Sequence, residues 1–278
     1  MAYGWCFCTL KKVRRTRGSS GGTYAERGNE FHYRWVAQRL LKLLRPASRL
    51  ESVTVEGDIA PKDGDESLDA VEYYSDGRKR HIQLKHSTTK RDVAANLSDY
   101  PKTIKDFAKI FSNEERANKA IFSIITNRQW SASANKKLES LGAGETSEDK
   151  LWMDVAKVLK TEQGSVLFRD FCSRLELIGG EPDLQEQMSG IKRTLSEHLP
   201  TLADTNRANQ IVQIVRDRAI AVGKEREPIR TQDILAALEV FCEEDVFPAP
   251  QRYDEGNDYV DNQGLKELRS AIDESKDH

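Results

Sequence analysis

The sequence is poor in cysteine, which limits the kinds of site it can hold. Its 278 residues include only four cysteines, Cys6, Cys8, Cys172 and Cys242. Cys6 and Cys8 have no second Cys/His pair at the spacing of a zinc site, and the four thiols do not form the pattern of a disulfide-bonded secreted domain. We therefore expect buried or idle thiols and neither a structural zinc site nor a disulfide framework.

Long apolar runs are also missing. No stretch approaches the roughly eighteen apolar residues that predict a membrane-spanning helix. The N-terminus, MAYGWCFCTLKKVRR, places its apolar residues before its basic ones, which reverses the order of a secretory signal. Apolar residues make up 38% of the chain and charged residues 32%. We predict a cytoplasmic protein that has charged surfaces and no contact with a membrane.

Charge is spread unevenly along the chain. Residues 1–50 hold 11 Lys and Arg against two Glu, whereas the whole chain has a net charge of −2. A second basic segment, RKRHIQLKHSTTKR at 78–91, carries six Lys and Arg and no acidic residue. This asymmetry is consistent with a polyanionic partner near the N-terminal half, although a solvated charged face would look the same.

The first half of the chain alternates helical and strand patterns. Phe31, Val36 and Leu40 recur at helical spacing, and an Asp76-Gly77 turn separates two β-patterned runs, as in a hairpin. The expected order is α-β-β-β-α-β, with a helix at about 25–45, strands at 51–59, 67–74 and 79–86, a helix from Pro101 and a strand at 119–127.

The second half reads as mainly helical. We divide the chain into a flexible basic arm at 1–22, a core at 23–144 and a helical region at 145–245, in which SRLELIGG is a candidate short strand. The remaining segment, 246–278, is acidic and is interpreted as a linker leading to a downstream module. The fold class is α/β with a mixed sheet, followed by a mainly helical region.

The predicted hairpin carries a polar set that a structural hairpin does not need. Gln83 and Lys85 share one face of their strand because side chains alternate along a strand. Asp69 lies on the preceding strand, at the end that pairs beside Lys85. Whether its face coincides with theirs depends on the register of the turn, which the sequence leaves open.

Such a set suits metal-dependent hydrolysis of a phosphodiester. That reaction needs a divalent cation held by oxygen ligands and positive charge near the phosphate. Asp69 would be the central metal ligand, Gln83 or the backbone beside it would offer a carbonyl oxygen, and Lys85 would orient water or neutralise charge. Glu56 is a candidate further carboxylate and Asp58 is its rival.

Basic residues around the hairpin are candidate phosphate contacts. They would provide affinity for nucleic acid without reading its sequence. The predicted DNA-binding residues are Arg78, Lys79, Arg80, His86, Lys90, Arg91 and Arg128.

These motifs resemble those of the restriction-endonuclease-like PD-(D/E)xK nucleases. More narrowly, the chain resembles the endonuclease domain at the N-terminus of bacterial anti-phage effectors, namely SAVED-type effectors of CBASS systems and STAND NTPase sensors of AVAST systems. The resemblance rests on GGTYAERGNEFHYRW, SLDAVEYY, HIQLKHS and IITNRQW, over roughly residues 20–130 and more loosely to about 250. Gln83 replaces the usual acidic residue, Arg34 follows Tyr33 where a glutamine is common, and Ala70 follows Asp69.

The resemblance implies cleavage of double-stranded DNA with Mg²⁺, or Mn²⁺ as an alternative, by Asp69, Gln83 and Lys85. It leaves the second acid open between Glu56 and Glu30. It also implies little sequence specificity, activation by homo-oligomerisation, and a downstream regulatory module, either a STAND NTPase or a ligand sensor. This chain has no GxxxxGK[ST] motif of its own. Two alternatives remain: an inactive nucleic-acid-binding or scaffold module, and an RNase with the same core.

Overall fold

The structure is a computed structural model that describes residues 20–45, 47–58, 68–113, 120–200, 204–220 and 227–239, with side chains from residue 28 onward. Nearly all of the predicted basic arm at 1–22 and all of the predicted acidic linker at 246–278 lie outside the described residues. No helix in the described part of the chain has both the length and the apolar character of a membrane span.

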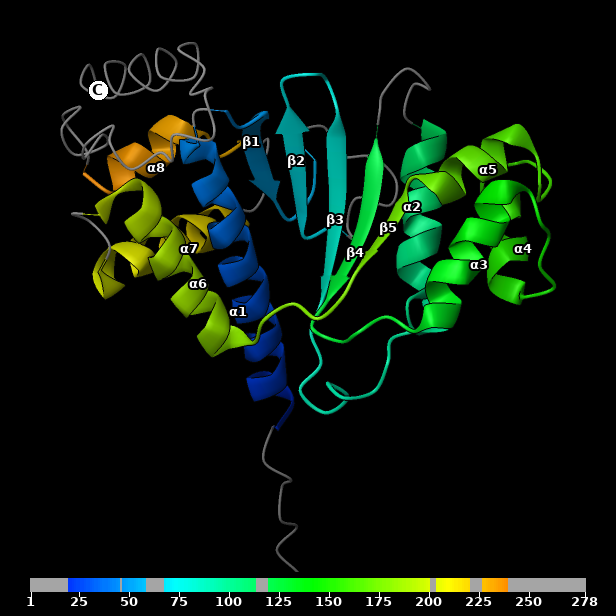
Figure 1. Ribbon diagram of the computed structural model, residues 1–278, viewed down its shortest axis with the longest axis horizontal. Coiled ribbons are helices and arrows are strands. Elements are labelled where there is room, and N and C mark those ends of the chain that lie inside the picture. The colour runs from blue at the N-terminus through cyan, green and yellow to red at the C-terminus, as the bar shows by residue number, and fades with distance from the viewer. Residues whose placement is uncertain are drawn as a thin grey trace, which may run out of the picture.

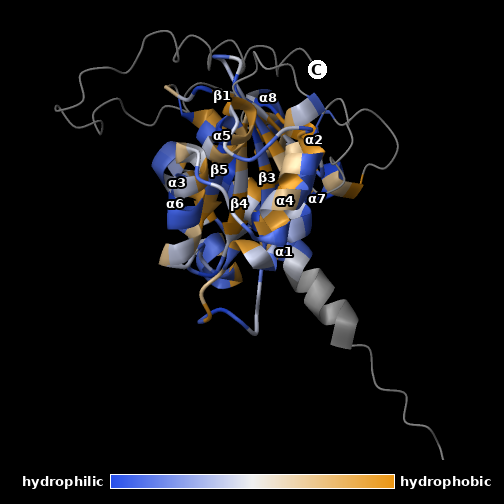
Figure 2. Ribbon diagram, turned by 90° about the vertical axis from the view of Figure 1, so that its right-hand side faces the viewer, coloured by the Kyte–Doolittle hydropathy of each residue, from blue (hydrophilic) through white to orange (hydrophobic). Residues whose placement is uncertain are grey.

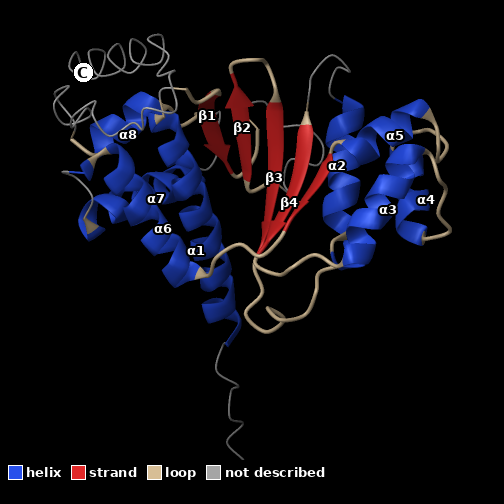
Figure 3. Ribbon diagram, viewed as in Figure 1, coloured by secondary structure: helices blue, strands red, loops and turns tan. Residues whose placement is uncertain are grey.

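A five-stranded mixed sheet forms the centre of the fold (Figure 3). Its order follows the sequence: the first three strands are antiparallel neighbours, and the last two lie parallel to the third. The strands are β1 (Leu50–Val55), β2 (Ala70–Tyr74), β3 (Lys79–Lys85), β4 (Ile121–Thr126) and β5 (Leu175–Ile178).

Helices cover both faces of this sheet (Figure 1). The long helix α1 packs with three C-terminal helices on one face, and four helices from the middle of the chain pack on the other. The helices are α1 (Ser20–Leu40), α2 (Pro101–Asn113), α3 (Ala132–Ala143), α4 (Lys150–Val158), α5 (Val166–Ser173), α6 (Leu184–His198), α7 (Thr205–Ile220) and α8 (Thr231–Ala237), with short 3-10 turns η1 (Leu41–Leu44) and η3 (Leu97–Asp99).

Alternation along the strands divides the core into two layers. Ile82 and Leu84 belong to the apolar cluster on the α1 side. Val71, Phe122 and Ile124 belong to the cluster on the α2 side. Apolar residues accordingly gather in the strands between the two helical layers (Figure 2).

The turn between β2 and β3 follows its sequence signal. Gly77 adopts a φ of 76°, which favours glycine. Its amide donates to the Tyr74 carbonyl at 2.9 Å, and the Arg78 amide donates to the Asp76 carboxylate at 3.1 Å. The predicted Asp-Gly hairpin is therefore confirmed.

The α/β class, the mixed sheet and the order α-β-β-β-α-β are confirmed. Helix α3, within the predicted core, was not among the predicted elements, whereas α5 lies in the region predicted to be mainly helical. The candidate strand in SRLELIGG is β5, which pairs with β4. The region 145–245 therefore contributes a strand to the sheet as well as helices.

A buried ion pair joins α1 to the sheet. Glu72 in β2 is fully buried, and the Arg39 guanidinium donates to both of its oxygens at 2.5 and 2.9 Å. The Tyr74 hydroxyl donates to the same carboxylate at 2.6 Å, and Arg80 lies 3.6 Å away. Burial alone would raise the pKa of Glu72, but Arg39 and its neighbours hold that pKa below its ordinary value.

Candidate functional site

The predicted catalytic residues meet at one end of the sheet. The middle of α1, the start of β2 and the end of β3 come together there. Val71 pairs with His81 and Ala70 with Ile82, which places Asp69 beside Gln83. This register answers the question that the sequence left open: Asp69, Gln83 and Lys85 share a face.

The Asp69 carboxylate is fixed by three groups. Its Oδ2 accepts a hydrogen bond from the Leu84 backbone amide at 2.5 Å and another from the Gln83 side-chain amide. Its Oδ1 lies 3.3 Å from Nδ1 of His32, which projects from α1. The carboxylate is therefore held by the sheet through one oxygen and faces the helix with the other.

Lys85 is the positive charge of this group. It lies at the last position of β3 and is partly buried. Burial lowers the pKa of its ammonium, the Asp69 carboxylate acts in the opposite direction, and Lys102 at the start of α2 lowers it further. Asp69 and Lys85 are therefore close enough to interact electrostatically.

Glu56 also lies at this end of the sheet. It follows β1, and its backbone amide donates to the Asp69 carbonyl at 2.9 Å. Its φ of 58° lies in the left-handed region, which costs a non-glycine residue free energy. Burial raises the pKa of Tyr33 on α1, and the Glu56 charge raises it further, so the Glu56 carboxylate is near α1.

The two rival acids are engaged elsewhere. Asp58 is buried and accepts from the Tyr73 hydroxyl at 2.6 Å and from the Lys79 ammonium at 3.0 Å. Glu30 accepts from Arg34 at 2.6 Å and from Arg216 of α7 at 2.5 Å. Burial would raise the pKa of Glu30, but these two arginines hold it below its ordinary value. Of the three acids, Glu56 is the one whose backbone bonds directly to Asp69.

The donor set at Asp69 fits a lightly held divalent cation. No group of three or more His, Cys, Asp or Glu residues that could enclose a metal exists among the described residues. A cation at Asp69 would therefore take its other ligands from amide or backbone oxygens, water and a phosphate, which is how Mg²⁺ is commonly bound. The Asp69 carboxylate, the Gln83 side-chain oxygen and the nearby Glu56 would hold it.

The predicted DNA-binding residues fall at two ends of β3. Arg78 directly precedes the strand, and Lys79 and Arg80 begin it. Lys79 is about 20 Å from Lys85 at a rise of about 3.3 Å per residue. All three are ion-paired, Arg78 with Asp76, Lys79 with Asp58 and Arg80 with Glu176.

The remaining predicted contacts lie at the catalytic end. His86 stacks on Phe31 of α1, with ring centroids 4.7 Å apart. Lys90 and Arg91 are exposed in the loop that follows β3. His86 directly follows the end of β3, whereas Lys90 and Arg91 lie further along the loop, where Arg91 pairs with Asp183 and Glu186. The first three basic residues lie at the other end of the strand.

Arg128 lies inside the protein, where it holds this loop. Its side chain donates to the Val93 and Ala94 carbonyls at 2.8 Å each, and its guanidinium lies 3.0 Å from the Asp99 carboxylate. Arg128 itself is 5% exposed, so a contact with DNA would require these bonds to break.

We predict that Arg128→Ala loosens the loop without unfolding the protein. Loss of hydrogen bonds made by a charged group should lower stability by about 1.5–3 kcal/mol. Trypsin should cut faster after Lys90 and Arg91, as followed by mass spectrometry of the fragments. Arg169→Ala, at an exposed arginine on α5, is the control and should leave the cutting rate unchanged.

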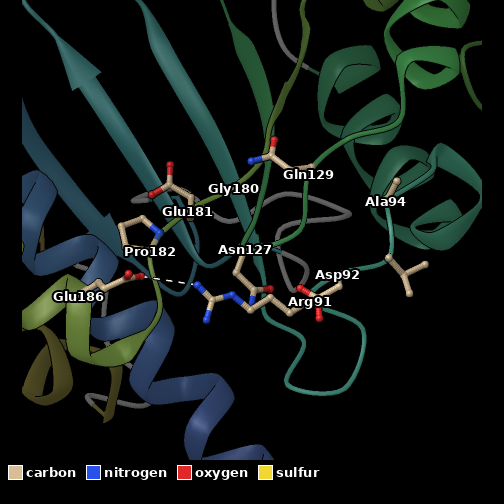
Figure 4. Close-up of a pocket in the computed structure, with 10 residues that line it drawn as sticks. Arg91, Asp92, Ala94, Asn127, Gln129, Gly180, Glu181, Pro182 and Glu186 are labelled. Atoms are coloured by element: carbon tan, nitrogen blue, oxygen red, sulfur yellow. Dashed lines mark ion pairs between the residues drawn. The ribbon is translucent and has the colours of Figure 1, made fainter.

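A cleft of about 620 Å³ opens beside this loop (Figure 4). Arg91, Asp92, Glu181 and Glu186 are among the residues that line it. Three carboxylates against one arginine make it a poor place for a DNA phosphate, and Arg91 is already 3.7 Å from Glu186. Asn127 connects the cleft to the site, because its side chain exchanges two hydrogen bonds of 2.9 Å with the Ser87 backbone.

His32 is the site residue that the sequence analysis missed. Phe31, Trp35 and Val36, its neighbours on α1, are buried, whereas the His32 side chain is 18% exposed. A histidine beside the apolar stripe of a helix is the only signal in the sequence, and it does not say which strand the helix crosses. The contact with Asp69 depends on how α1 packs on the sheet.

Comparisons with known proteins find no matching family model and no matching curated protein. Among solved structures, the chain is similar to the Cap4 SAVED/CARF-domain containing receptor of Moraxella osloensis, with 14% identity and a TM-score of 0.44, over 76% of this chain and 47% of the receptor. The Cap4 receptor of Acinetobacter baumannii with the cyclic trinucleotide 3'3'3'-cAAA also gives 14% identity and a TM-score of 0.44, over 76% of this chain and 44% of the receptor. The chain spans less than half the length of either receptor.

Proposed function

We propose that the chain is a metal-dependent endonuclease that hydrolyses phosphodiester bonds of double-stranded DNA on a restriction-endonuclease-like core. The observation that supports this most directly is the position of Asp69 beside Gln83, with Lys85 on the same face at the end of β3. The Asp69 carboxylate holds the Leu84 amide near the end of β3, but this contact does not need the Lys85 ammonium, and the neighbouring core is apolar.

Each residue has a distinct role in this proposal. Asp69 would bind the cation through the oxygen that faces α1, while the Leu84 amide keeps the carboxylate oriented. Lys85 would stabilise the negative charge that develops on the phosphate oxygens and orient the attacking water. The bound cation, Mg²⁺ or Mn²⁺, would polarise the phosphate and make a bound water more acidic.

The DNA backbone would approach from the loop after β3. Lys90 is exposed there and His86 lies between it and the strand, whereas Arg91 is paired with Asp183 and Glu186. Contacts of this kind neutralise phosphates irrespective of base sequence, so we expect little sequence specificity.

From the resemblance of its motifs, we also propose that the protein acts in anti-phage defence. Its nuclease would be switched on by homo-oligomerisation under a downstream regulatory module. Cleavage by the chain alone should then rise more than linearly with protein concentration.

The proposal is tested with supercoiled plasmid DNA. The purified chain should convert it to nicked and linear forms in Mg²⁺ or Mn²⁺, and EDTA should stop the reaction completely because no chemistry remains without the cation. Parallel reactions with double-stranded RNA distinguish a DNase from an RNase. Cleavage that continues in EDTA, or binding of DNA without cleavage at any concentration, would contradict the proposal.

A second candidate, an inactive nucleic-acid-binding module, is favoured by one observation. The Gln83 amide nitrogen donates to Asp69, so this side chain acts as a donor to the carboxylate, where a cation would need its oxygen. Filter binding in EDTA tests this candidate, because an inactive module would bind DNA equally well with and without the cation.

A further inference from the structure

We propose that His32 is a metal ligand and gives the site a preference for transition-metal cations over Mg²⁺. This inference rests on the proposed function, since it concerns the cation that the nuclease would use. It assigns a role to a residue of α1, whereas the proposed catalytic residues all come from the β2–β3 hairpin.

Two candidate ligand atoms lie at a distance that one cation can span. Nδ1 of His32 lies 3.3 Å from Oδ1 of Asp69. Two ligands that are each about 2.1 Å from one cation, at an angle of about 100°, are separated by this distance. A cation can therefore contact both atoms with little movement of either side chain.

The two oxygens of the Asp69 carboxylate have different partners. Oδ2 accepts from the Leu84 amide and from Gln83. Oδ1 is the oxygen turned toward His32. The sheet thus orients the carboxylate so that the oxygen left for a cation is the one that already faces an imidazole.

The part of α1 that carries the imidazole is held in place by its neighbours. Phe31, next to His32, is fully buried and stacks on His86, which follows β3 directly. Glu30, on the other side, is ion-paired with Arg34 and with Arg216 of α7. These contacts fix the turn of α1 that carries His32, and a fixed ligand binds a cation with less loss of entropy.

The chemistry of imidazole then determines which cation is preferred. Mg²⁺ favours oxygen ligands and retains much of its water, whereas Mn²⁺, Co²⁺ and Zn²⁺ accept a nitrogen ligand readily. One carboxylate, one imidazole and an amide oxygen form a mixed nitrogen and oxygen set. We therefore expect this chain to bind Mn²⁺ more tightly than Mg²⁺, and the excess affinity to depend on His32.

The test measures binding of the metal without DNA. Mn²⁺ and Mg²⁺ are titrated separately into the full chain by isothermal titration calorimetry, for the wild type, His32→Ala and His32→Asn. Asparagine retains a hydrogen-bond donor toward Asp69 but removes the imidazole. His198→Asn, at the end of α6 and beside Arg45, is the matched control. Melting curves check that each variant is folded.

We expect both His32 variants to weaken Mn²⁺ binding by at least about tenfold and to change Mg²⁺ binding by less than about threefold. The control should match the wild type. Equal weakening for both cations, or rescue of Mn²⁺ binding by asparagine, would mean that His32 only positions Asp69 and would overturn this inference. Mn²⁺ binding that is unchanged in both His32 variants would overturn it and leave the proposed nuclease intact, whereas a wild type that binds neither cation and cuts no DNA would overturn both.

Discussion

Asp69→Asn is expected to reduce metal-dependent cleavage of plasmid DNA by at least about a thousandfold, because it removes the charge that holds the cation. The asparagine oxygen can still accept a hydrogen bond from the Leu84 amide, which donates to Asp69 at 2.5 Å. The shape of the site should therefore be preserved while its ability to bind a cation is lost. Initial rates of plasmid nicking at saturating Mg²⁺ and Mn²⁺ measure the effect.

The matched control is Asp217→Asn, at an exposed aspartate on α7 that accepts from Gln213. Its cleavage rate should equal that of the wild type. Both variants should melt within a few degrees of the wild type, which separates loss of chemistry from loss of fold. Cleavage by Asp69→Asn at more than a tenth of the wild-type rate would show that the cation is held by other residues.

Whether a contact in this site could be predicted from the sequence depended on how far apart its two residues lie along the chain. Gln83 and Lys85 lie two residues apart on one strand, so the alternation of a strand places them on one face. Asp69 is 14 residues from Gln83, and their contact required the register of the Asp76-Gly77 turn. The sequence predicted the turn but left its register open, and the structure supplies the missing step.

The periodicity of apolar residues could not predict contacts between a helix and the sheet. His32 and Asp69 meet because α1 crosses the end of β2, and hydrophobic patterns say which face of a helix is buried but not against what. The same limit applies to Glu30, a candidate metal ligand that is instead paired with Arg216 of α7. It applies to Arg128 as well, whose guanidinium is bound to loop carbonyls.

Charge counts along the sequence also overstated the basic surface. The segment 78–91 contains six Lys and Arg and no acid of its own. Acids from distant segments pair with several of these residues, as Glu176 does with Arg80 and Asp183 with Arg91. The net positive charge that a DNA backbone would meet is therefore smaller than the sequence indicates.

Arg39→Ala is expected to lower the free energy of unfolding by about 3–5 kcal/mol, because it leaves a buried carboxylate without its main partner. Glu72 is fully buried, and the Arg39 guanidinium donates to both of its oxygens. Arg80, 3.6 Å away, can compensate for only part of this loss. Urea unfolding at pH 7 measures the change. Arg49→Ala, in which an arginine that is 72% exposed loses a 3.8 Å contact with Asp76, is the control and should change stability by less than about 1 kcal/mol.

The pH dependence of this loss identifies its cause. In the wild type the pKa of Glu72 lies below its ordinary value, so the pair stabilises the fold above the unfolded-state pKa, and that stability is lost as pH falls through the folded-state pKa. In Arg39→Ala, burial without the arginine should raise the pKa of Glu72, so the carboxylate takes up a proton as pH falls and its desolvation cost disappears. The difference between wild type and variant should therefore be largest near pH 7 and smaller at about pH 4, near the ordinary pKa of glutamate.

The double variant Arg39→Met with Glu72→Leu separates the loss of the pair from the exposure of one partner. Apolar residues of similar length fill the same space without a buried charge, so the double variant should be more stable than Arg39→Ala and close to the wild type. A double variant as unstable as Arg39→Ala would mean that the arginine stabilises the fold through its packing on Trp35, where its guanidinium lies 5.6 Å from the ring centre.

Because Arg39 lies two turns of α1 beyond His32, a loss of this pair should also loosen the helix that presents the imidazole to Asp69. Stability and metal binding are expected to fall together in Arg39→Ala, whereas His32→Asn should affect metal binding alone.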